Sequence, residues 1–180
     1  MRFDQLKRRK YTRRVLMGAL VFTVAMAQNV PWLPPVYGAR ALPLLPLVAV
    51  IAVYDQPVPA ILFGALAGAL WDVASPAYGL HAVYLAAAAF ACAMCMRYFL
   101  NRNLLTVALL CLGTAALYLL ARWFADYAVL EALTAAEMTR PLLREALPTL
   151  GYTMLTVPVC ALAVTGIVRR TSRRQITVDN

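Results

Sequence analysis

The stretch FGALAGALWDVASPAYGLHAVY, residues 63–84, places ionisable side chains inside an otherwise apolar part of the chain. Gly64, Gly68 and Asp72 recur every fourth residue, so they lie along one face of a predicted helix. His81, the only histidine in the sequence, follows a short turn. An ionised carboxylate inside a membrane is costly unless it reaches water or a partner. We therefore expect the turn to satisfy Asp72 and to join two helices.

The composition indicates a membrane protein. Of 180 residues, 63% are apolar and 14% are charged, against about half and about a quarter in soluble domains. A water-soluble fold of this size must keep much of its surface wet and could not bury so much apolar side chain. The net charge of +9 is concentrated at the two ends of the chain. It is not accompanied by a nucleic-acid motif, so we expect no nucleic-acid partner.

Six apolar segments predict an all-α polytopic fold with six transmembrane helices. A bilayer core of about 30 Å needs about 20 helical residues. The second and third segments are shorter, so we expect them to borrow flanking residues, thin the bilayer or form a partly embedded hairpin. The six segments cover residues 15–33, 41–54, 57–71, 80–99, 104–123 and 147–168.

Basic residues predict the orientation of these spans. The arm 1–14 holds seven, the tail 169–180 holds four, and the loop after the fourth span adds two. Six spans, all within a transmembrane domain of residues 15–168, put these thirteen on one side and four on the other. By the positive-inside rule both termini are expected in the cytoplasm. Aromatic residues near the span ends, including Trp71 and Phe124, are typical of interfacial belts.

The longest loop, 124–147, is expected on the outer side. Apolar and charged residues alternate there at roughly helical spacing, and TAAE (134–137) has the form of a capping box. One or two short helices could lie on the membrane surface, under a partner, or as a lid over the protein itself.

The small residues and the turn each have two interpretations. The Gly64 and Gly68 face could pack on the next span, where Ala87, Ala91 and Cys95 form a comparable stripe, or it could receive a helix of another protein. We favour internal packing.

Asp72 and His81 are expected to organise a turn containing Ser75, Pro76 and Gly79, because a proton relay would need more buried ionisable groups. Cys92 and Cys95 have the spacing of a redox or metal pair, but no second pair or histidine cluster accompanies them. Helix packing is the favoured interpretation of these cysteines, and no metal or cofactor is expected.

The order of these features resembles the signature of the rod shape-determining protein MreD family. In that family a similar third span ends in an aspartate, followed by a turn with proline and glycine and a GLHA-like helix start. The proline-rich stretch 40–68 also resembles the second and third spans of the family. The matching positions here are Asp72, Ser75, Pro76, Gly79, Leu80, His81 and Ala82.

The resemblance implies a non-catalytic scaffold in the bacterial inner membrane. MreD-like proteins belong to the elongation machinery that sets cell shape and directs peptidoglycan synthesis. They bind the bitopic protein MreC, and through it MreB filaments, RodA and a class B penicillin-binding protein. The sequence itself has no nucleophile–base pair, phosphate-binding glycine loop or metal-ligand set. The basic ends are expected to contact anionic membrane lipid.

Transport is the alternative function. The MreD family is thought to share its six-helix plan with the substrate-binding subunits of energy-coupling-factor vitamin transporters. Such a subunit would enclose an outward-opening polar pocket. The polar residues of this chain's spans are few, which favours the scaffold, although a shared fold cannot decide between the two functions.

Overall fold

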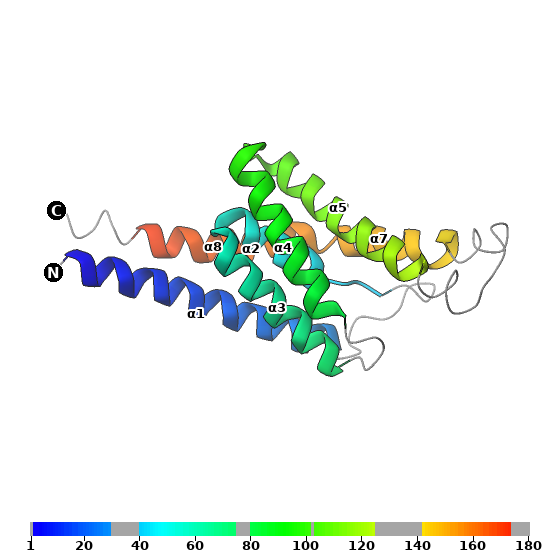
Figure 1. Cartoon of the computed structure of the whole chain (residues 1–180), viewed down its shortest axis with the longest axis horizontal. Coiled ribbons are helices and arrows are strands. Elements are labelled where there is room, and N and C mark those ends of the chain that lie inside the picture. Colours follow the sequence, from blue (N-terminus) through cyan, green and yellow to red (C-terminus); the bar gives the residue numbers. More distant parts are fainter. Residues whose placement is uncertain (1, 30–39, 75–79, 102, 125–141, 174–180) are drawn as a thin grey trace.

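The computed structural model describes residues 2–29, 40–74, 80–101, 103–124 and 142–173. Over these ranges the chain is all-helical and contains no strand, which confirms the predicted all-α class (Figure 1). The elements are α1 (Arg2–Asn29), α2 (Leu44–Tyr54), α3 (Pro57–Ala74), α4 (His81–Tyr98), α5 (Leu104–Trp123), a π-helical turn η2 (Leu142–Ala146), α7 (Leu147–Met154) and α8 (Val157–Arg173).

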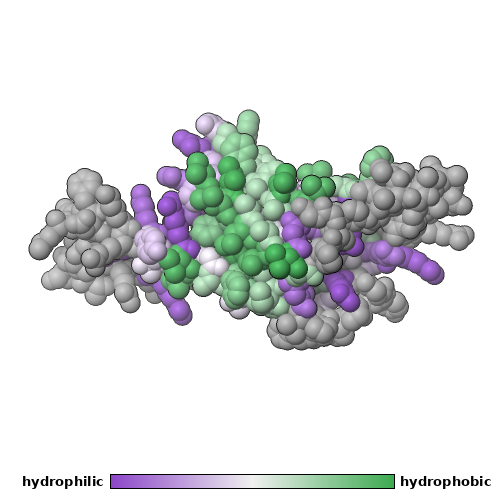
Figure 2. All heavy atoms as spheres, turned by 60° about the horizontal axis from the view of Figure 1, so that its bottom comes forward, coloured by the Kyte–Doolittle hydropathy of each residue, from purple (hydrophilic) through white to green (hydrophobic). Residues whose placement is uncertain are grey.

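Four helical stretches are long and apolar enough to cross a membrane: Pro57–Ala74, His81–Tyr98, Leu104–Trp123 and Leu143–Thr171. On the face shown in Figure 2, a broad apolar band is flanked on both sides by hydrophilic residues. Both observations support a membrane protein. The third segment borrows flanking residues, as one of the expected alternatives had it, because α3 continues beyond residue 71 to Ala74 and reaches 18 residues.

Helix α2 is the short element at the centre of the bundle. Ten of its eleven residues are buried, and it contacts α1, α3, α4, α5 and α8. Eleven helical residues rise only about 16 Å, roughly half of a bilayer core. Because neighbouring helices cover α2, its apolar surface meets protein rather than lipid.

Side chains from other helices satisfy the backbone at the start of α2. The first amides of a helix have no intrahelical acceptor, and Pro43 and Pro46 supply no N–H at all. The Leu44 amide donates to Oε1 of Gln28 on α1 at 3.2 Å, and the Leu42 amide donates to Oγ1 of Thr153 on α7 at 3.1 Å. Polar backbone can therefore begin a helix here without water.

An ion pair holds the other end of α2. Asp55 accepts a hydrogen bond from the Gln56 amide at 2.9 Å and pairs with the Arg13 guanidinium of α1 at 3.0 Å. The Asp55 side chain is only 2% exposed, and buried Asp55 Oδ2 and Arg13 Nε make no hydrogen bond. Arg13 and Gln28 lie fifteen residues apart on α1, about 22 Å along its axis. α2 therefore runs antiparallel to α1 and is fastened to it at both ends.

The predicted sixth span is two helices. α7 ends at Met154, and α8 begins at Val157 and continues to Arg173. Pro158 has no N–H to donate to the carbonyl of Met154, one turn earlier. The Thr156 amide bonds to the carbonyl of Thr153, three residues earlier, at 3.0 Å, and not to the one four residues earlier. The missing donor explains the break. Helix α1 is unbroken from Arg2 and runs through the predicted basic arm 1–14.

Helices α3 and α4 pack backbone to backbone at the two glycines. A Cβ built on Gly64 would lie closer than 3.0 Å to backbone atoms of Leu85 and Ala86. A Cβ built on Gly68 would lie equally close to backbone atoms of His81 and Ala82. Internal packing of this face is therefore confirmed, and α4 occupies the space that a partner helix would need.

The prediction that the small stripe of α4 at Ala87, Ala91 and Cys95 packs against α3 was wrong. Ala87 and Ala91 are exposed and Cys95 is only partly buried, whereas the contacts with the glycines come from residues 81–86. The start of α4 is fixed by its bonds to Asp72. This sets the rotation of the helix and turns the predicted stripe away from α3.

We expect Gly68→Ala to lower the stability of the fold by about 1–3 kcal/mol, because the new methyl group would overlap α4 backbone that cannot move alone. Gly113→Ala is the matched control, since nothing lies within 4 Å of a Cβ there. By helix propensity alone this control should gain up to about 1 kcal/mol. Titration with sodium dodecyl sulfate, followed by circular dichroism, measures both. Equal unfolding midpoints for the two variants would contradict the packing.

We expect Arg13→Ala to cost about 3 kcal/mol, because it leaves the buried Asp55 carboxylate without its cation. The double variant Arg13→Leu/Asp55→Asn should recover most of this loss, since Asn still accepts a bond from the Gln56 amide and carries no charge. The same unfolding titration tests the pair. The two single variants of this cycle are Arg13→Leu and Asp55→Asn. If the double variant lost as much stability as these two lose together, the two side chains would not interact.

Candidate functional site

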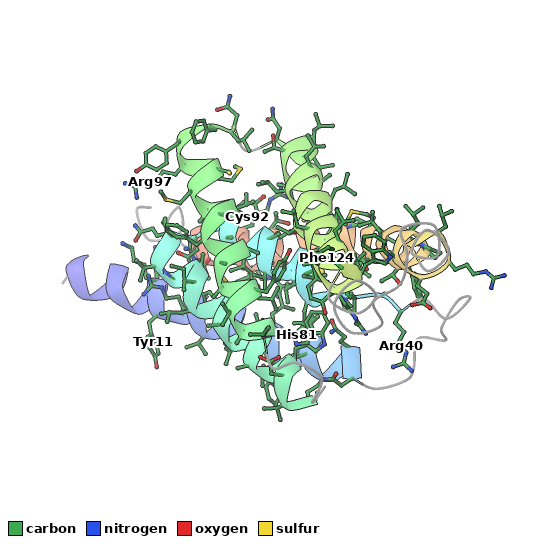
Figure 3. The ribbon with its side chains drawn as sticks, turned by 45° about the vertical axis from the view of Figure 1, so that its right-hand side comes forward. Tyr11, Arg40, His81, Cys92, Arg97 and Phe124 are labelled. Atoms are coloured by element: carbon green, nitrogen blue, oxygen red, sulfur yellow. The ribbon has the colours of Figure 1, made fainter. Side chains whose placement is uncertain are left out.

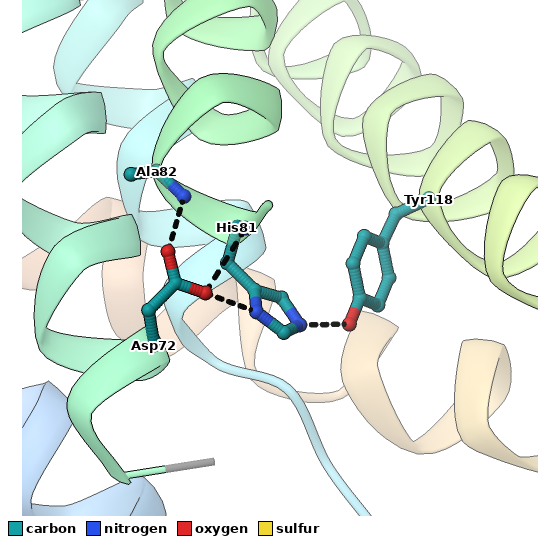
Figure 4. Close-up of polar contacts among 4 residues, drawn as sticks. All are labelled: Asp72, His81, Ala82 and Tyr118. Carbon is teal, nitrogen blue, oxygen red and sulfur yellow. Dashed lines mark hydrogen bonds and ion pairs between the residues drawn. The ribbon is translucent and has the colours of Figure 1, made fainter. Parts of the chain in front are cut away.

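The Asp72 carboxylate caps the start of α4 from the last turn of α3. Its Oδ1 accepts the His81 amide at 3.1 Å and its Oδ2 accepts the Ala82 amide at 3.0 Å (Figure 4). These are two of the amides that a helix start leaves without intrahelical partners, and the positive end of the helix dipole favours a negative charge at this point. Asp72 therefore does the work of an N-cap, although it belongs to the preceding helix.

The His81 ring lies inside the bundle, whereas Tyr11 and Arg97 point away from it (Figure 3). Nδ1 of the ring lies 2.6 Å from Asp72 Oδ1, and Nε2 lies 2.9 Å from the Tyr118 hydroxyl of α5. A neutral ring protonated at Nδ1 donates to Asp72 and accepts from Tyr118. A charged ring donates to both, because a phenol oxygen can also accept. Both contacts are satisfied in either charge state.

Aromatic rings enclose this polar chain. The Trp71 ring stacks on the His81 ring with centroids 4.5 Å apart and an interplanar angle of 20°. Tyr118 packs against Trp71 at 5.3 Å and against Tyr84 at 5.3 Å, and the Tyr84 hydroxyl donates to the Thr114 carbonyl at 2.7 Å. The side chains of His81 and Asp72 are only 12% and 17% exposed. We call Trp71, Asp72, His81 and Tyr118 the hairpin cluster.

The assignment of Trp71 to an interfacial belt was wrong. Trp71 is buried, because its ring stacks on His81 instead of facing outward from the bundle. Phe124 is exposed, as a belt residue would be. A tryptophan at the end of a span is therefore not a safe indicator of the interface when the next residue is an ionised side chain that must be enclosed.

The geometry of the hairpin cluster favours a structural role, in which it links neighbouring helices, over a role as a reactive centre. An aspartate that orients a histidine is also found in hydrolytic triads, where the other ring nitrogen takes a proton from a nucleophile. Here that nitrogen bonds the Tyr118 phenol, and Trp71 covers a face of the ring. The arrangement links α3, α4 and α5 through one carboxylate.

The predicted site residues fall into three groups. Asp72 and His81 bond each other directly, and the glycines at 64 and 68 lie along the same helix-to-helix contact. Ser75, Pro76 and Gly79 lie outside the described residues, as do the capping box 134–137 and most of the loop 124–147. Among the residues that the structure describes, no group of three or more metal-ligating side chains could hold an ion.

The cysteines lie among the packed helices as free thiols. The Cys111 thiol donates to the Pro46 carbonyl at 3.8 Å, and the Cys160 thiol donates to the Pro43 carbonyl at 3.8 Å. Both thiols thus face the proline-containing start of α2. This agrees with the interpretation of the cysteines as packing residues.

Trp71 and Tyr118 are the members of the cluster that sequence reasoning did not assign to the site. Trp71 is adjacent to Asp72 in the sequence, so its position was a usable signal. Tyr118 lies 37 residues from His81, and only the arrangement of the helices brings the two together. A hydroxyl near the end of an apolar span was the sole indication in the sequence.

Comparison with protein-family models, with curated proteins and with solved structures finds no match for this chain.

We expect Asp72→Asn to destabilise the protein by about 2–3 kcal/mol, because hydrogen bonds to an ionised acceptor are stronger than those to a neutral one. In addition, the NH2 group of the new side chain would face the N–H donors of α4 in place of a carboxylate oxygen. Tyr118→Phe removes one hydroxyl and should cost about 1 kcal/mol. Thermal unfolding of the purified chain in detergent measures both. An Asp72→Asn variant with the wild-type unfolding midpoint would reduce the carboxylate to a dispensable turn residue.

Proposed function

We propose that this chain is a six-pass, non-catalytic scaffold of the bacterial inner membrane, similar to MreD, that binds an MreC-like single-span protein. Through that partner it would join MreB filaments, RodA and a class B penicillin-binding protein in cell elongation. The resemblance of residues 70–85 to the MreD signature motivates the proposal. The geometry of the hairpin cluster supports it.

The observation that carries the proposal is the closed state of the hairpin cluster. Asp72 accepts bonds from two amides and the imidazole, and His81 uses both ring nitrogens. Polar side chains that are bonded to one another and enclosed by aromatic rings have little left to offer a substrate. They make the α3–α4 hairpin rigid, and a rigid surface loses less entropy when a partner docks.

The end of this hairpin carries exposed apolar side chains. Val73 lies in the last turn of α3, Leu80 immediately precedes α4, and Val83 lies in the first turn of α4; all three are exposed. They border Asp72 and His81 in the sequence, so the hairpin cluster fixes the backbone that presents them. We propose that they contribute to the surface that meets the MreC-like partner.

Charge supports cytoplasmic ends for a six-pass arrangement. The first turns of α1 and the last turns of α8 lie at the same end of the bundle (Figure 1). Arg97 lies toward that end and Arg40 lies toward the other (Figure 3). Arg97 is one of the thirteen basic residues expected on the cytoplasmic side. Its place at the same end as the start of α1 and the end of α8 is what that orientation requires.

We expect Val83→Trp to reduce the amount of MreC-like protein recovered with the tagged chain several-fold, while the level of the chain itself stays normal. Val159→Trp on α8 is the matched control, because the two valines are 67% and 68% exposed. Affinity purification from membranes, quantified by mass spectrometry, measures recovery. Normal recovery for Val83→Trp would remove this surface from the proposal.

Recovery without any MreC-like protein, together with a vitamin that stays bound through detergent extraction and gel filtration, would favour the transport alternative.

A fusion of alkaline phosphatase after Asn180 should be inactive, because that enzyme needs the periplasm and the tail is expected inside. A fusion at Arg40 should be active, since this residue lies toward the opposite end of the bundle. Enzyme activity in intact cells, corrected for fusion level by immunoblot, measures both. An active fusion after Asn180 would overturn the six-pass topology and the family resemblance with it.

A further inference from the structure

A groove runs between α1 and α3 at the Asp55 end of the bundle. Its volume is about 480 Å³, within the range of about 300–1,000 Å³ that is typical of ligand sites. The buried side chains of Pro59 and Phe63 are among its lining residues. The exposed side chains of Val15, Val58, Leu62 and Leu66 complete its apolar lining.

The groove is polar at one end only. Arg14 of α1 and Gln56, just before α3, line it there. Val58, Leu62 and Leu66 follow at four-residue intervals along α3, so the apolar part extends about 12 Å away from these polar groups. Arg14 is exposed and makes no ion pair with any residue whose side chain the structure describes. Lys10, one helical turn earlier on the same face, is also exposed.

The nearby ion pair leaves this positive charge in place. Arg13 is bound to Asp55 at 3.0 Å, so the one described carboxylate at this end is matched by its own cation. Arg14 and Lys10 then remain as positive charge beside the groove. A ligand that fits must have an anionic group at one end and a long apolar body.

We propose that this groove binds one anionic glycerophospholipid. The phosphate contacts Arg14 and Gln56, Lys10 adds attraction for the headgroup, and an acyl chain lies along Phe63, Leu62 and Leu66. Phosphate oxygens and a guanidinium form strong charge-assisted hydrogen bonds. The inference needs the chain to lie in a membrane and is independent of the scaffold role, because none of the residues lining the groove belongs to the hairpin cluster.

Native mass spectrometry of the full chain tests the lipid preference. Phosphatidylglycerol and phosphatidylcholine with the same acyl chains are added separately to the delipidated protein in detergent. We expect phosphatidylglycerol to be retained more strongly. Arg14→Gln should weaken its apparent affinity about tenfold, the loss expected for one charge-assisted contact. Arg170→Gln, an exposed arginine near the end of α8, should keep the wild-type affinity.

A second pair of variants tests the apolar part of the groove. Leu62→Trp should fill it and lower retention of phosphatidylglycerol, whereas Leu117→Trp on α5 should not, although these leucines are 66% and 64% exposed. Equal retention of the two lipids by the wild type would overturn the proposal. Equal losses for Arg14→Gln and Arg170→Gln would also overturn it and indicate a diffuse basic surface.

A photoreactive residue placed at position 62 identifies the occupant in native membranes. An adduct with the mass of a phospholipid supports the lipid site. A covalent adduct with another protein, in place of lipid, would overturn it and identify the groove as the seat of a partner helix.

Discussion

Buried backbone groups must find hydrogen-bond partners within the protein when no water reaches them. This requirement constrains the structure most strongly at the two ends of α2. A helix of eleven residues, nearly all buried by its neighbours, cannot hydrate its ends from within the bundle. Gln28 and Thr153 supply acceptors at its start, and Arg13 pairs with the aspartate at its finish. Those three side chains come from α1 and α7, so the helices around α2 are positioned by the needs of its ends as well as by packing.

The α3–α4 hairpin applies the same rule in a different way. Two glycines allow the backbones of α3 and α4 to touch. Such close contact matters because packing, rather than hydrophobicity, drives the association of helices in lipid. Asp72 then closes the hairpin by accepting the first amides of α4. His81 extends that carboxylate to Tyr118 and so attaches α5. A single acidic residue thus serves a helix start, an imidazole and, through the imidazole, a third helix.

Local and periodic features could be predicted from the sequence, and pairings between distant segments could not. The four-residue spacing of Gly64, Gly68 and Asp72 was enough to place them on one helix face and to expect close packing. The rotation of α4 was not predictable, because Ala87 and Ala91 belong to a helix so rich in alanine that several small faces exist. Arg13 was predicted only as one of the seven basic residues of the arm 1–14, and its contact with Asp55 depends on how α1 lies beside α2.

The unbroken course of α1 has a mechanical consequence. The helix continues from Arg2 through Arg13 to Gln28 as one element, and its first eleven residues extend about 16 Å along the axis beyond the ion pair. The ion pair joins the end of this segment to Asp55, at the end of α2. A displacement of the start of α1 would therefore be transmitted, through Arg13 and Asp55, to the buried helix α2.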